Sequence, residues 1–214
     1  MKIKLLLLIL ILAINLTSSS QNINLIPMYG NASKTDEQIN ADNKFYKYCD
    51  KNFKSRKEAS KYFEKRGWDY FYANKLDTSM MRFNQAWMLD SLNSNTYWGF
   101  ANLLGSKGEI EKSIPLFNKA IELDKKNPKL LESASTSYLQ LWFKTKNDKY
   151  IEQGITLLKQ SISIDDKNGR AFGQLAIAYY YKQDFTNAKK YFDIAMKLSP
   201  NSINPQAKEA LMKL

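Results

Sequence analysis

Apolar residues recur at a fixed spacing along most of this chain, with polar residues between them. Two copies of the pattern lie 34 residues apart and a third follows later: Gly67, Tyr70, Phe83 and Ala86; Ala101, Leu104, Phe117 and Ala120; and Leu175, Ala176, Tyr179, Ala188, Phe192, Ala195 and Pro200. A period of this length is typical of a unit that cannot bury its own apolar face and stacks on further copies.

Each copy predicts two helices joined by a turn. In the last copy, Phe172, Leu175 and Tyr179 are spaced as one face of a helix. Asp184 is a suitable N-cap for the second helix, and Pro200 ends it. The order of small residue, tyrosine, alanine, phenylalanine, alanine and proline at this spacing resembles the tetratricopeptide repeat.

The resemblance implies an all-α, right-handed α-solenoid of helix-turn-helix repeats with terminal capping helices. The spacing places four repeats at 60–93, 94–127, 128–168 and 169–202. In the third repeat the second helix arrives seven residues late, so residues 143–149 form either a longer turn or an extra helical turn.

The regions outside the repeats have separate roles. Residues 35–59 predict an N-terminal capping helix and lead-in, because Thr35 and Gln38 form a capping box before a helical stripe. Residues 203–214 predict a C-terminal capping helix that starts after Asn204. Residues 21–34 predict a flexible, exposed leader.

Residues 1–20 predict a secretory signal peptide. Lys2 and Lys4 precede an apolar run, and small residues follow it at 17–20. The alternative is an uncleaved anchor. A lipid anchor needs a cysteine at the end of the run, and the sole cysteine is Cys49. We therefore expect an exported bacterial protein, periplasmic or extracellular, that is not stably inserted in a membrane after cleavage.

The composition argues against an enzyme. The chain has no histidine, which removes the usual general base and every histidine metal site. Asp165 and Asp166 are adjacent on a predicted helix end, where neighbouring side chains point apart. We expect no catalytic residue, no metal and no cofactor.

The charge favours acidic partners. The formal net charge of +11 becomes +9 when Lys2 and Lys4 are removed. The lysines are spread along the chain, however, as solvating charge on helix surfaces commonly is, so we expect no nucleic-acid partner. A binder of anionic glycan or lipid headgroups through this basic surface stays open as an alternative function.

The resemblance also implies a binding surface, because in this family the first helices of successive repeats line a concave groove for peptides or partner helices. The residues on the face not used for packing are Trp68, Tyr72, Trp98, Asn102, Thr136, Gln140, Ile177 and Tyr181. Aromatic residues of this kind anchor partners. The alternative is that the helix at 36–53 folds back and buries Trp68 and Phe71 as core, and that Tyr180 and Tyr181 pack against the C-terminal helix.

Some members of this family grip a terminal carboxylate with lysine, asparagine and arginine. Glu64, Trp68 and Glu132 occupy positions where that clamp needs other residues, and Asn102 alone matches. The predicted function is an exported non-enzymatic adaptor or scaffold for a protein or peptide partner. The sequence predicts neither the identity of that partner nor an oligomeric state.

Overall fold

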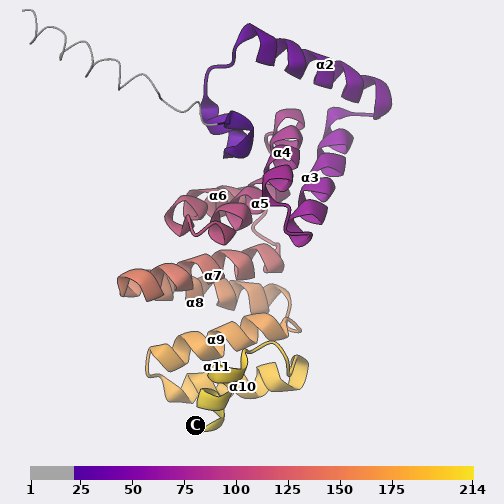
Figure 1. Cartoon of the computed structure of the whole chain (residues 1–214). Helices are drawn as coiled ribbons and strands as arrows, with labels where there is room; N and C mark the ends of the chain where they lie inside the picture. The colour runs from indigo at the N-terminus through magenta and orange to yellow at the C-terminus, as the bar shows by residue number, and fades with distance from the viewer. Residues whose placement is uncertain (1–21) are drawn as a thin grey trace, which may run out of the picture.

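The computed structural model describes residues 22–214, which form a ladder of stacked helix pairs without a β-strand among them (Figure 1). The predicted signal peptide lies outside the described residues. The elements are η1 (Ile23–Leu25), η2 (Pro27–Asn31), α2 (Asp36–Asn52), α3 (Arg56–Tyr72), α4 (Leu76–Leu89), α5 (Ser94–Ser106), α6 (Ile110–Leu123), α7 (Pro128–Thr145), α8 (Asp148–Ile164), α9 (Gly169–Tyr181), α10 (Phe185–Leu198) and α11 (Pro205–Met212).

Four helix pairs make up the solenoid: α3 with α4, α5 with α6, α7 with α8, and α9 with α10. Each pair packs on the next, so that the apolar core runs the length of the ladder. Phe83, Phe117 and Phe192, which the repeat spacing places at equivalent positions, are all buried. The predicted all-α solenoid of repeated helix pairs with helical ends is confirmed.

Two glycines allow the Phe83 ring to lie between α3 and α5. A Cβ atom on Gly67 would come within 2.6 Å of this ring, and one on Gly99 within 2.2 Å. Both distances are far below ordinary carbon–carbon contact. Neither position therefore has room for a side chain, which explains the glycine next to the aromatic residues of α5.

The late second helix of the third repeat is explained by helix extension. α7 is five residues longer than α5 and α8 is three residues longer than α6, while the turn between them is one residue shorter. Only Lys146 and Asn147 separate α7 from α8. Of the two alternatives for residues 143–149, the structure shows the extra helical turn.

The N-terminal segment differs from the exposed leader that the sequence suggested. The side-chain amide of Asn84 on α4 donates hydrogen bonds of 2.9 Å to the backbone oxygens of Asn24 and Ile26. Tyr29 is buried, and its hydroxyl lies 3.1 Å from the sulfur of Met88. These contacts involve residues about sixty positions apart, and a local pattern contains no information about them.

The capping helices have the predicted starts. Thr35 and Gln38 make both hydrogen bonds of the capping box at α2. α2 packs through its aromatic face on the end of α3 around Phe63, and it does not cover Trp68 or Phe71. The alternative in which this helix buries those two residues is therefore wrong.

At the other end, α11 packs on α9 and α10. Asn204 caps it by accepting a hydrogen bond of 2.9 Å from the backbone of Ala207. Leu211 of this helix is buried, whereas Leu214 is exposed. This cap shields the apolar face that the last helix pair would otherwise leave in water.

Candidate functional site

A concave surface runs along the first helices of the first three repeats and continues to Asp165 and Asn168 in the turn between α8 and α9 and to Arg170 at the start of α9. Two adjoining hollows of about 470 and 240 Å³ share Asn102, Glu132, Ser133 and Arg170, and together we call them the central groove. Its lining residues are Trp68, Phe71, Tyr72, Trp98, Asn102, Gly105, Ser106, Lys129, Glu132, Ser133, Thr136, Ser137, Gln140, Asp165, Asn168 and Arg170. Six of the eight predicted site residues lie here.

One wall of the central groove is aromatic. The ring centroids of Trp68 and Trp98 are 4.8 Å apart in an edge-on arrangement, and Tyr72 stacks on Trp68 at 5.9 Å. Trp68 also contacts the buried ring of Phe83 at 5.4 Å, edge-on. Because each ring restrains the next, the wall has a fixed shape before any partner arrives.

The three aromatic residues differ in how far they reach solvent. Tyr72 is 78% exposed, whereas Trp68 and Trp98 are half-buried and pack against the core. The indole nitrogen of Trp98 is buried without a hydrogen-bond partner among the described residues. Trp98 is therefore partly a core residue as well as a lining residue, and Tyr72 is the freest contact on this wall.

The opposite wall is polar and centres on Glu132. This side chain is 7% exposed. Its carboxylate forms an ion pair with Arg170 Nε at 3.0 Å and accepts a hydrogen bond from the Asn168 amide at 3.1 Å. The Gln174 amide approaches the same carboxylate at 3.4 Å. A buried carboxylate needs such partners, and the pair holds the exposed Arg170 guanidinium over the groove.

Two polar residues of the predicted site are engaged within their own helices. The Asn102 amide donates a hydrogen bond of 2.9 Å to the backbone oxygen of Trp98, and the Thr136 hydroxyl donates one of 3.2 Å to the backbone oxygen of Glu132. The Asn102 side-chain oxygen is not used in these bonds. Gln140 is exposed at the far end of the groove.

Burial perturbs one carboxyl group beside the aromatic wall. The pKa of Glu64 is raised, because burial disfavours the charged form more than hydrogen bonding to the side chains of Asn95 and Trp68 favours it. Glu64 lies outside the groove lining, in a neighbouring hollow at the ends of α3 and α4. Its effect is on stability, since it does not face the groove.

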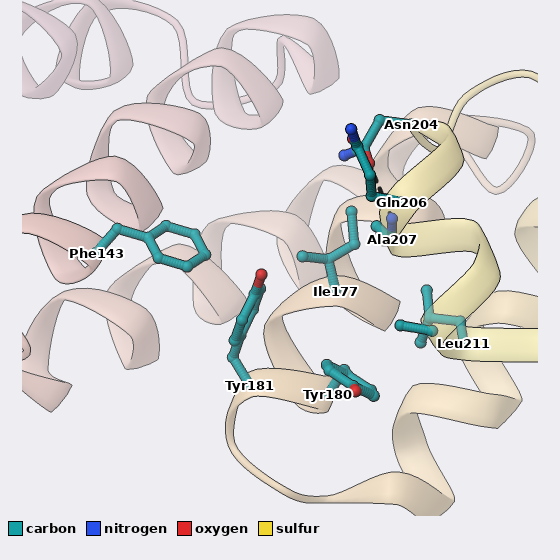
Figure 2. Close-up of a pocket in the computed structure, with 9 residues that line it drawn as sticks. Phe143, Ile177, Tyr180, Tyr181, Asn204, Gln206, Ala207 and Leu211 are labelled. Carbon is teal, nitrogen blue, oxygen red and sulfur yellow. Dashed lines mark hydrogen bonds between the residues drawn. The ribbon is translucent and has the colours of Figure 1, made fainter. Parts of the chain in front are cut away.

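The remaining two predicted site residues, Ile177 and Tyr181, lie in a separate place. They line a pocket between α9 and α11, which we call the C-terminal pocket (Figure 2). The structure therefore divides the eight predicted residues between two sites. The alternative in which both tyrosines pack against the C-terminal helix holds in part: Tyr180 is partly buried on the core cluster that includes Leu211 of α11, whereas Tyr181 is 45% exposed.

The sequence analysis missed Lys129 and Arg170 as lining residues. Each is the second residue of the first helix in its repeat, and the two are separated by the length of the extended third repeat. This equivalence was visible in the sequence. The pairing of Arg170 with Glu132 depends on how the third and fourth repeats stack and was not visible there.

Neither a cluster of metal-binding side chains nor a helix able to cross a membrane is found among residues 22–214. Between residues 22 and 214, no three metal-binding side chains of the histidine, cysteine or carboxylate type gather at one place. None of the helices in this range combines the length and apolarity that crossing a bilayer requires.

Comparison with known families identifies the repeating unit. A family model described as "Tetratricopeptide repeat" matches residues 94–127 and 169–202, the two stretches that the spacing assigned to the second and fourth repeats. The chain contains tetratricopeptide repeats. No curated protein matches the sequence.

Several solved structures share this fold. That of pilF from Pseudomonas aeruginosa superposes with a TM-score of 0.64 at 17% identity, over 74% of this chain and 69% of that one. The structure of a tetratricopeptide protein of Thermus thermophilus, TTC0263, superposes with a TM-score of 0.60 at 14% identity, over 72% of this chain and 80% of that one. The first tetratricopeptide domain of Spaghetti (RPAP3), solved with a bound HSP90 peptide, superposes with a TM-score of 0.50 at 21% identity, over 58% of this chain and 91% of that one.

Proposed function

We propose that this protein is an exported, non-enzymatic adaptor that holds an extended segment of a partner protein in the central groove. The observation that carries the proposal is the pairing of the two walls. Ordered aromatic rings around Trp68 lie across the hollow from the Arg170–Glu132 pair. Aromatic and arginine side chains provide most of the binding energy in protein interfaces.

The comparisons support this class of function. A protein of similar fold, RPAP3, was solved with a bound peptide. In the present chain the groove is open and shallow, and its lining combines apolar rings with amide and hydroxyl groups that can bond a peptide backbone. The absence of histidine from the sequence also favours binding over catalysis.

Two substitutions test the central groove. Trp98→Ala removes a half-buried ring, and we expect it to weaken partner capture by about 2 kcal/mol, roughly thirtyfold. Tyr72→Ala removes a ring that is 78% exposed, so it lowers capture without the loss of packing. The measurement is affinity capture of the native partner from the source cells, with circular dichroism to verify folding.

Tyr62→Ala is the matched control, because Tyr62 is an exposed tyrosine on the same helix and lies outside the groove lining. Capture that is equal for the native protein and both groove variants, with all of them folded, would move the site away from this groove. Capture that depends steeply on salt concentration and not on the rings would instead favour the anionic-surface alternative.

Export is a separate part of the proposal and rests on the sequence. The charged start, the apolar run and the small residues after it support cleavage near Ser20 and Gln21. N-terminal sequencing of the protein isolated from its source cells tests this. A cytoplasmic protein that retains Met1 would exclude export.

A further inference from the structure

The C-terminal pocket is the second concavity of the chain that contains predicted site residues. It has a volume of about 360 Å³ and lies where α9 meets α11 and the end of α7. Its lining residues are Phe143, Ile177, Tyr180, Tyr181, Asn204, Gln206, Ala207, Ala210 and Leu211. Figure 2 shows Phe143 and the two tyrosines on one side of the space, and the residues of α11 on the other.

The aromatic side of this pocket is exposed and yet ordered. Phe143 and Tyr181 are 42% and 45% exposed, and their rings meet edge-on with centroids 4.7 Å apart. Tyr181 also contacts the ring of Tyr180 edge-on at 5.8 Å. The rings thus keep one another in place while their outer faces stay available to a ligand.

The lining carries no carboxylate, ammonium or guanidinium group. The floor is aliphatic, from Ile177, Ala207 and Leu211, and the amides of Asn204 and Gln206 lie at the rim (Figure 2). A charged group that entered would lose its hydration without a partner of opposite charge. The pocket therefore suits an uncharged, apolar group that carries hydrogen-bonding atoms at its edge.

A positive charge stands beside the aromatic side. The ammonium of Lys146 lies 5.3 Å from the Phe143 ring centroid and 4.6 Å from that of Trp142. Lys146 takes part in none of the ion pairs formed among residues 22–214. The sequence from residue 22 onward has a net charge of +9, which is the total of +11 less Lys2 and Lys4. Asp148 accepts a hydrogen bond of 3.1 Å from the Trp142 indole, so the local charge is mixed. The cation beside Phe143 is the ammonium of Lys146, and it is this group that favours a carboxylate there.

We infer that the C-terminal pocket receives an aromatic side chain of an acidic protein segment, with a carboxylate of that segment beside Lys146. The inference rests on the proposed function, peptide binding by this solenoid. It adds a second anchor point, and it states the chemistry of the bound segment: an uncharged ring next to an aspartate or glutamate.

The test uses two minimal probes, N-acetyl-aspartyl-phenylalanine amide and N-acetyl-lysyl-phenylalanine amide. Each is titrated into the ¹⁵N-labelled full-length protein, and the backbone amide shifts are followed by NMR. We expect the aspartyl probe to shift the amides around Ala207 and Ala210, and to bind about threefold to fivefold more tightly than the lysyl probe at low salt.

Variants separate the two parts of the inference. Tyr181→Ala removes one wall and weakens both probes by about tenfold. Lys146→Asn keeps both probes bound but abolishes the preference for aspartate. Asparagine suits this position because Lys146 has a φ of 55°, in the left-handed region.

Tyr72→Ala is the control, since it lies in the central groove and leaves both probes unaffected. If the proposed function fails while this inference holds, Tyr72→Ala leaves partner capture intact and the aspartyl probe still binds at α11. The inference is overturned if neither probe shifts residues of α9 and α11, if the shifts map to the central groove, or if the two probes bind equally. Binding of methyl β-glucoside in place of the probes would make the pocket a glycan site and would also overturn it.

Discussion

Replacing Gly99 by alanine is the sharpest test of how the central groove is built. The new Cβ atom would lie 2.2 Å from Cζ and 2.3 Å from Cε1 of Phe83. Nonbonded carbon atoms prefer about 3.5–4.0 Å, so the ring has to move by more than about 1 Å. Phe83 is fully buried and has the rings of Trp68 and Phe100 beside it, which leaves no free direction.

Two opposing effects determine the size of the change. Overpacking of a dense core costs about 1–3 kcal/mol, whereas glycine to alanine within a helix gains up to about 1 kcal/mol. A contact as short as this belongs at the upper end of the overpacking range. We therefore expect Gly99→Ala to lose about 2 kcal/mol of unfolding free energy.

Gly105 provides a control on the same helix. A Cβ atom at Gly105 would meet only the hydroxyl oxygen of Ser137, at 3.8 Å, which is ordinary contact. Gly105→Ala should therefore gain about 0.5–1 kcal/mol. Urea titrations followed by far-ultraviolet circular dichroism compare the two variants. The packing argument is refuted if the midpoint for Gly99→Ala is equal to or higher than the midpoint for Gly105→Ala.

Two further predictions concern stability. Phe192→Ala should lower the unfolding free energy by about 3–5 kcal/mol, because Phe192 is 5% exposed in the core of the last repeat. Lys189→Ala breaks only an ion pair on the surface and should cost less than about 0.5 kcal/mol, so equal urea midpoints for the two variants would contradict the placement of Phe192 in the core. Glu64→Gln should raise the urea midpoint at neutral pH, because burial raises the pKa of Glu64 and the folded state disfavours its charged form. The gain should fade as the pH drops below about 3.5, where Glu64 is protonated in both states, and a gain that is constant with pH would exclude this cause.

The helices and the order of the repeats follow from short-range information. The Thr35 capping box, the Asp184 cap and the proline after α10 act within a few residues of themselves, and the structure has all three helix ends where these residues predict them. The repeat spacing brings Phe83 and Phe117 to equivalent places for the same reason. A helix exposes one face every three to four residues whatever lies beyond it.

The structure divides the eight predicted site residues between two hollows, and their role in binding a partner stays a prediction. Side chains such as Trp98 and Asn102 face the hollow because the packing face of α5 is already taken by Tyr97 and Ala101. Whether Tyr181 shares a groove with Trp98 depends on how far the stack turns between the second and fourth repeats. The extension of α7 to Thr145 places Phe143 beside Tyr181 and makes a second pocket.

By itself the sequence determined the class of fold and the starts of α2 and α10, since these depend on residues within one or two turns of each other. The tertiary structure alone decided three further features. They are the packing of residues 22–31 on Asn84, the burial of Glu132 under Arg170, and the separation of the C-terminal pocket from the central groove. Each joins residues between 38 and 60 positions apart in the chain, or combines three helices, so each exists only once the pairs have stacked. Long-range contacts of this kind are set by the shape of the assembled core, and no local pattern encodes that shape.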